Sequence, residues 1–175
     1  MKYKGIELEG LDKEVRLAHS RFMETDGGTD WIDKLLTCDK AALTPTQFHE
    51  VSALSSIINM DYQICNGGIG QYVCNGYHEY RAPYSDDDVA QLDKTGQCDM
   101  LVELGALARE AFPERMVERQ ELLAVQEELR ELDEEDEEDE GKFDEIEEDY
   151  YTVSDFLGVL CEAYAQYLCK SYGIA

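Results

Sequence analysis

Apolar residues recur through most of this chain at spacings of three and four, the repeat of one face of an α-helix. Leu11, Val15, Ala18 and Phe22 show the pattern first. Sustained alternation of apolar and polar residues, which is typical of strands, does not occur. Only three prolines interrupt the 175 residues, so long stretches are free to be helical. The pattern predicts an all-α fold, a single-domain bundle of about seven or eight helices.

Local signals place the ends of these helices. The clearest start is Thr44-Pro45-Thr46-Gln47, where a threonine cap, a proline at the first helical position and a capping-box glutamine stand in order. Asn66-Gly67-Gly68 ends that helix, because glycine readily takes the left-handed conformation at a helix end. Gly96 and Pro113 bound a later helix, and Ser154 starts the last one. The expected helices cover about 11–22, 30–36, 45–65, 69–75, 85–95, 97–111, 117–132 and 154–168.

Length and composition favour one cytoplasmic domain. A chain of 175 residues with 43% apolar residues can bury a core without disulfides or a metal ion. The first residues lack the apolar run of a signal peptide, and no stretch is long enough to span a bilayer. The six cysteines are scattered without a C-x-x-C pair, so we expect reduced, buried thiols. The sequence thus predicts one domain, residues 1–175, with an acidic segment at 133–149.

The strongest charge feature is a run of eight consecutive acids, Asp133 to Glu140. The whole chain has a net charge of −25, and residues 114–149 alone contain 19 acids and four bases. Such a surface repels nucleic acids and anionic membranes and leaves cations, basic proteins and neutral surfaces as partners. If helical, the run carries one charge per roughly 1.5 Å, close to the one per about 1.7 Å of duplex DNA. This density indicates mimicry of a polyanion.

We therefore assign the acids of this segment as candidate partner-binding residues. The expected partner is a basic protein such as a DNA-binding protein, without direct contact to nucleic acid or membrane. The candidates are Asp133, Glu134, Glu135, Asp136, Glu137, Glu138, Asp139, Glu140, Asp144, Glu145, Glu147, Glu148 and Asp149.

Two other roles for the segment remain open. The run could be a solvated connection that only solubilises a protein with a structural or immunity-type role. Residues 136–147 also overlay part of an EF-hand loop, with glycine at the sixth position and an acid at the twelfth. The longer glutamates at the third and fifth positions would crowd such a loop. Its candidate calcium ligands are Asp136, Glu138, Glu140, Asp144 and Glu147.

Catalytic motifs are missing from the sequence. His49-Glu50 and His78-Glu79 begin like the zinc-protease motif H-E-x-x-H, but alanine stands where each second histidine belongs. No G-x-S-x-G nucleophile elbow is present. We therefore expect no enzyme activity and no cofactor.

The glycine-rich stretch Asn66-Gly67-Gly68-Ile69-Gly70-Gln71 matches neither a dinucleotide-binding motif nor a P-loop. We interpret it as a tight helix–turn–helix corner in which Gln71 and Asn75 serve the freed backbone groups. With the residues up to Asn75 it resembles the N-G-G-F-x-Q-[FY]-x-x-N signature of a family of small bacterial helical proteins. Ile69 replaces the usual phenylalanine. The resemblance extends over about residues 44–170.

This family includes a DNA-mimic protein that binds a transcriptional regulator, and most other members have no assigned role. The resemblance implies an all-helical fold and favours DNA mimicry, with a homodimer as an open possibility. Its signature shapes the backbone and carries no chemistry of its own. Asn66, Gly67, Gly68, Gln71 and Asn75 are accordingly structural candidates.

Overall fold

The computed structural model describes residues 1–11, 31–74, 94–115, 120–121, 124–125, 128 and 140–175. The described part is mostly helical and contains four α-helices, with helical residues also between 120 and 128. The elements are β1 (Lys2–Tyr3), β2 (Ile6–Glu7), α2 (Trp31–Thr37), a 3₁₀ turn (Lys40–Ala42), α3 (Pro45–Cys74), α5 (Lys94–Ala111) and α7 (Glu140–Tyr172).

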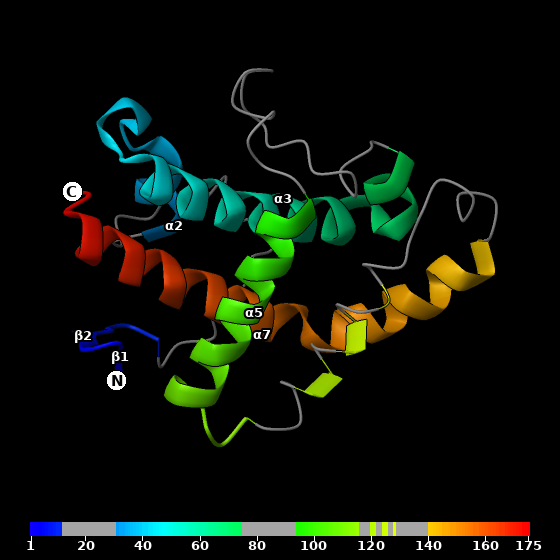
Figure 1. Ribbon diagram of the computed structural model, residues 1–175. Helices are drawn as coiled ribbons and strands as arrows, with labels where there is room; N and C mark the ends of the chain where they lie inside the picture. Colours follow the sequence, from blue (N-terminus) through cyan, green and yellow to red (C-terminus); the bar gives the residue numbers. More distant parts are fainter. Residues whose placement is uncertain (12–30, 75–93, 116–119, 122–123, 126–127, 129–139) are drawn as a thin grey trace.

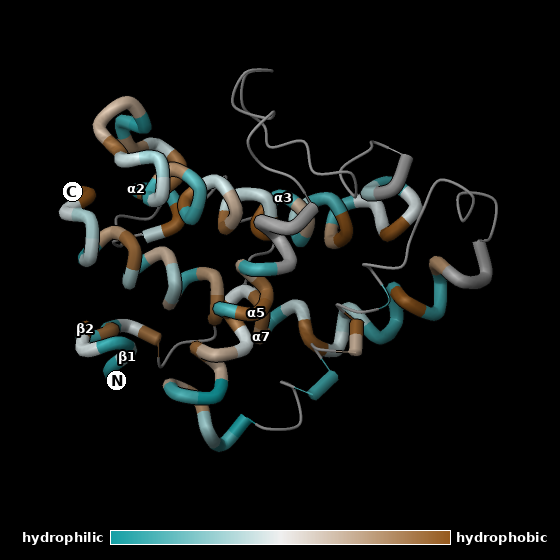
Figure 2. The backbone as a smooth tube through the Cα atoms, viewed as in Figure 1, coloured by the Kyte–Doolittle hydropathy of each residue, from teal (hydrophilic) through white to brown (hydrophobic). Residues whose placement is uncertain are grey.

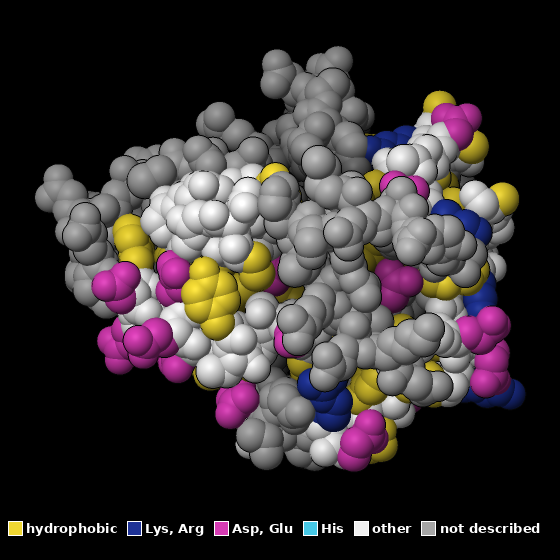
Figure 3. Space-filling model, turned by 180° about the vertical axis from the view of Figure 1, so that it is seen from behind, with side chains coloured by type: hydrophobic (Ala, Val, Ile, Leu, Met, Phe, Trp, Pro, Cys, Tyr) yellow, Lys and Arg dark blue, Asp and Glu magenta, His cyan; other side chains and the backbone are white. Residues whose placement is uncertain are grey.

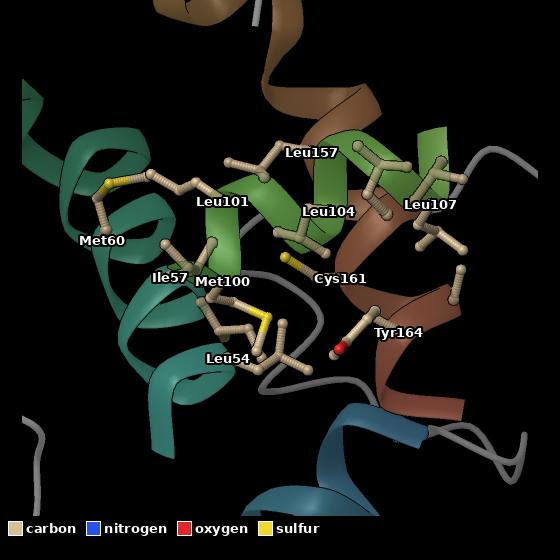
Figure 4. Close-up of a cluster of buried hydrophobic side chains, with 14 of the residues drawn as sticks. Leu54, Ile57, Met60, Met100, Leu101, Leu104, Leu107, Leu157, Cys161 and Tyr164 are labelled. Atoms are coloured by element: carbon tan, nitrogen blue, oxygen red, sulfur yellow. The ribbon is translucent and has the colours of Figure 1, made fainter. Parts of the chain in front are cut away.

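The two longest helices form the body of the molecule. In Figure 1, α3 and α7 lie side by side and run in opposite directions, and α5 crosses them. Helix α2 packs mainly on α7, and β1 packs against α5. The hydrophobic core lies where α3, α5 and α7 meet, as Figure 4 shows. Fully buried side chains from the three helices fill it, among them Leu54, Ile57, Leu104, Leu107, Leu157 and Tyr164.

The start of α3 confirms the predicted capping box. The backbone N–H of Thr44 donates to Gln47 Oε1 at 2.9 Å. In return, the N–H of Gln47 donates to Thr44 Oγ1 at 3.4 Å. Two N–H groups that the helix itself leaves unpaired are satisfied by this exchange. Helix α3 therefore begins where the sequence placed it.

We expect Thr44→Ala to lower the free energy of unfolding by about 1 kcal/mol, because the first turn loses its side-chain acceptor. Thr46→Ala is the matched control, since Thr46 is exposed two residues into the same helix. Urea unfolding followed by circular dichroism measures both variants. Equal midpoints for the two would contradict the capping role.

Three boundaries differ from the sequence-based expectation. Helix α7 begins at Glu140, fourteen residues before the predicted start at Ser154. Helix α5 begins at Lys94 and includes Gly96, because a single glycine costs only about 1 kcal/mol inside a helix. The chain also starts with an antiparallel hairpin that an all-α fold did not predict. Its strands have two residues each, too few to show a period, and its turn at Lys4-Gly5 has positive φ at both positions.

Other predictions have different outcomes. The expected second helix corresponds to α2, and the expected end before Pro113 corresponds to the end of α5 at Ala111. The number of seven or eight helices is not confirmed. Most residues of the helices expected at 11–22, 85–95 and 117–132 lie outside the described residues.

Candidate functional site

The first turns of α7 have one buried face. Phe143, Ile146, Tyr150 and Val153 are buried at spacings of three, four and three residues. This stripe continues into the core residues of the same helix, so burial of apolar surface supports helical structure well before Ser154. The sequence-based start at Ser154 missed this because a serine is a good cap and the acids before it disfavour a helix.

The opposite face of the same turns is acidic. Asp144, Glu145, Glu148 and Asp149 are exposed and lie at helical positions that share one side of α7. Within the described part of the chain, none of the four forms an ion pair with Lys or Arg. Figure 3 shows acidic side chains gathered at the left edge, the side on which this end of α7 lies, with no described basic side chain among them.

The acids of this face repel one another within the helix. Glu145 and Asp149 are four residues apart, and like charges at that spacing destabilise a helix. Both lie in the N-terminal half of α7 but beyond its first turn, the turn in which the helix dipole stabilises negative charge most. Figure 2 shows the hydrophilic residues that interrupt the apolar ones there.

The spacing of the four carboxylates resembles that of phosphates. Asp144 to Asp149 covers a helix rise of about 7.5 Å, or one charge per roughly 2 Å. Duplex DNA carries one charge per about 1.7 Å. The acidic face of α7, meaning Asp144, Glu145, Glu148 and Asp149, thus has nearly the linear charge density of DNA.

Glu147 behaves differently from its neighbours. It is only partly exposed, and its Oε2 accepts a hydrogen bond from the backbone N–H of Ile69 at 3.0 Å. Tyr151 Oη lies 3.1 Å from Glu147 Oε1 and 3.2 Å from the carbonyl oxygen of Ile64. Burial and the adjacent Glu147 raise the pKa of Tyr151 to about 12, so its hydroxyl keeps the proton that it donates. Glu147 was assigned to a partner, yet the structure places it against α3.

The glycine-rich corner is the segment of α3 that Glu147 contacts. Gly67 and Gly68 have non-helical backbone angles, and they separate a first helical part from a second part that begins at Ile69. Gly68 has φ +80°, a conformation that other residues rarely adopt. A Cβ atom at Gly68 would collide with the carboxylate of Glu147. The predicted helix–turn–helix corner is confirmed, and its contact with Glu147 could not be anticipated from sequence.

Gln71 closes the corner from the other side. Its Nε2 donates to Gln63 Oε1 at 2.8 Å and lies 3.4 Å from the Gln63 carbonyl oxygen. A Cβ at Gly67 would collide with this side chain. Asn66 is exposed, and the side chain of Asn75 lies outside the described residues.

A buried carboxyl group links α3 to α7 next to the corner. Asp61 is 1% exposed, and its Oδ1 accepts hydrogen bonds from the Tyr150 hydroxyl and, at 3.7 Å, from the Cys65 thiol. Burial outweighs these donors and raises the pKa of Asp61 to about 6. The sequence shows this aspartate within a helix but gives no sign of its partner, 89 residues further along the chain.

The thiols in the described part of the chain are free. Burial raises the pKa of Cys65 to about 12 and of Cys169 to about 11, and it raises the pKa of Cys161 as well. Protonated thiols of this kind are poor nucleophiles. The expected free and buried thiols are confirmed for Cys161 and Cys169, whereas Cys38 and Cys65 are free but only partly buried.

The remaining candidate residues have limited structural support. Asp133 to Asp139 lie outside the described residues, and Glu140 is described only as the first residue of α7. Residues 140–147 are helical, which removes the curved backbone that a calcium loop needs at its middle positions. No group of three or more possible metal ligands occurs among the described side chains.

A comparison with family models places the chain in a known group. A model described as DMP19-like protein matches residues 49–170. The chain belongs to the DMP19-like protein family. No curated protein and no solved structure gives a significant match.

The DMP19-like match agrees with the resemblance that the corner indicated. The family is that of DNA mimic protein 19, and the matched range contains the corner, Asp61 and the acidic face of α7. The N-terminal hairpin and α2 lie outside it. No helix in the described residues is long and apolar enough to cross a membrane.

Proposed function

We propose that this DMP19-like protein is a non-enzymatic acidic binding protein that acts as a DNA mimic. Its partner would be a basic DNA-binding protein such as a transcriptional regulator, whose DNA-binding surface it occupies. The observation that supports this most is the acidic face of α7, which combines exposure, helical structure and nearly the linear charge density of DNA.

The physical basis of such binding is electrostatic. A groove lined with Lys and Arg attracts a matching anionic surface from solution, and added salt weakens that attraction. The net charge of −25 strengthens the attraction at long range, while the acidic face supplies the local pattern. The run from Asp133 to Glu140 would extend that pattern. A homodimer stays a prediction, since one chain is described.

Release of proteins from immobilised DNA tests the proposal. Cell extract is bound to duplex DNA on a column at low salt, and the column is eluted with this protein at constant ionic strength. A DNA mimic should release a distinct basic protein. A second elution with poly-glutamate at equal charge concentration measures unspecific release. Release no better than that by poly-glutamate would overturn the proposal and leave a solubilising role for the acids.

Neutralising the acidic face should weaken this release. We expect the variant with Asn and Gln at the four positions to need about tenfold more protein for half-release, because charge pairing at the interface is lost. The control variant removes the same number of exposed carboxylates elsewhere, at Glu7, Glu9, Asp33 and Asp99. If both variants lose the same amount of release activity, the net charge of the protein alone accounts for release. A variant in which Ser and Gln replace the acids of residues 133–140 tests the adjoining run in the same assay.

A further inference from the structure

The glycine corner interrupts the backbone hydrogen bonding of α3 next to Ile69. Because Gly67 and Gly68 are not helical, the N–H of Ile69 begins a new helical part and lacks a carbonyl one turn earlier. Ile69 is fully buried, so water does not replace that partner. The structure gives this N–H an acceptor on α7, Glu147 Oε2, at 3.0 Å.

Both oxygens of Glu147 are used at this corner. Oε2 binds the part of α3 that follows the bend, through Ile69. Oε1 lies beside the Tyr151 hydroxyl, which also reaches the carbonyl oxygen of Ile64, before the bend. One hydroxyl proton serves these two acceptors in turn. Glu147 and Tyr151 therefore connect α7 to both sides of the bend.

The corner also has the shape that a carboxylate needs. The positive φ of Gly68 is accessible to glycine, and the missing side chain leaves the space that the Glu147 carboxylate occupies. The close approach of Glu147 is specific to Gly68, because a Cβ atom at nearby Gly70 would meet only the Phe143 ring, at 3.9 Å. One glycine of the motif thus makes room for an acid that lies 79 residues later.

We propose that the Gly67–Gly68 corner is an internal receptor for the Glu147 carboxylate, and that this contact sets the direction of the acidic face of α7. Glu147 is then a positioning residue and not a partner-binding one. The next residue, Glu148, is exposed. The contact holds α7 at the turns where repulsion between like charges favours fraying. The part that concerns partner binding rests on the proposed function.

Hydrogen exchange tests the contact without a partner. In Glu147→Ala the amide of Ile69 should exchange about tenfold faster or more, and the amides of 144–150 should follow, because a hydrogen bond to a charged acceptor is lost. Glu147→Gln keeps an acceptor of the same shape and should exchange like the parent. Glu148→Ala is the matched control and should leave Ile69 unchanged. Equal exchange at Ile69 in Glu147→Ala and Glu148→Ala would overturn the receptor.

The DNA-column assay tests the consequence for binding. Glu147→Gln should release the bound protein as the parent does, whereas Glu148→Gln should be weaker, since only Glu148 would face the partner. Equal weakening by both would show that Glu147 is a contact residue and would overturn its positioning role. If the parent itself releases nothing, the proposed function fails, and the exchange experiment still decides whether the corner holds Glu147.

Discussion

Replacing Asp61 with asparagine should raise the free energy of unfolding at pH 7 by about 3 kcal/mol. The Asp61 carboxyl is buried, and its pKa of about 6 exceeds its ordinary value of 3.8. Each unit of that difference corresponds to about 1.4 kcal/mol. Tyr150 and Cys65 both donate to Oδ1, so the amide oxygen of asparagine keeps both hydrogen bonds. The substitution therefore removes the cost of burying a charge and leaves the contacts in place.

The sign of the pH dependence follows from proton uptake. Between about pH 4 and 6 the folded protein holds a proton on Asp61 that the unfolded chain has already released. Stability from this group consequently falls as pH rises through that window. The difference in the free energy of unfolding between Asp61→Asn and the parent should be small near pH 4, increase up to about pH 6 and then stay constant.

Urea unfolding at pH values from 4 to 7.5 measures this difference. Asp149→Asn is the control, because it removes one negative charge from an exposed site of α7. The control corrects for the general relief of repulsion in a chain of net charge −25. It should shift stability by at most about 0.5 kcal/mol. If the free energy of unfolding changes with pH in the same way for the parent and for Asp61→Asn, Asp61 titrates in its ordinary range.

We expect Gly68→Ala to lower the free energy of unfolding by about 3 kcal/mol. A side chain in the left-handed conformation costs about 1–2 kcal/mol. The new Cβ also displaces the Glu147 carboxylate, which removes the hydrogen bond to the buried Ile69 N–H. Losing a hydrogen bond to a charged group costs roughly 1.5–3 kcal/mol. Strain and a lost contact thus act together at this position.

Gly70→Ala provides the matched control two residues away. Gly70 has helical neighbours and open space, so alanine there should be neutral or stabilise the protein by up to about 1 kcal/mol. Thermal unfolding of both variants at one pH measures the contrast. A Gly68→Ala protein as stable as Gly70→Ala would mean that the corner tolerates a side chain and that Glu147 is not essential to it.

Helix α7 combines two tasks in one element. Its C-terminal half carries Phe156, Leu160 and Tyr164 in the core, while its N-terminal turns carry the acidic face. Because the core anchors one end of the helix, the other end can present like charges that would not form a stable helix alone. This arrangement gives the proposed DNA mimic a surface whose spacing is set by a helix.

Interactions between neighbouring residues were predictable from sequence. The capping box of Thr44 and Gln47 and the stop at Pro113 act within one helical turn, so residue type and order suffice to locate them. The corner at Gly67 and Gly68 was recognisable for the same reason. Its motif also indicated the family that the comparison with family models confirmed. The helical class followed from the spacing of apolar residues.

Tertiary contacts decided what the same reasoning missed. The start of α7 at Glu140 depends on whether burial of Phe143 and Ile146 outweighs repulsion among the acids, and only packing against the rest of the fold settles that balance. Glu147 looked like any other acid of its segment until folding placed it against Ile69. Asp61 likewise acquires its raised pKa from burial, which outweighs the hydrogen bond from Tyr150, and neither the burial nor this partner is encoded near Asp61 in the chain.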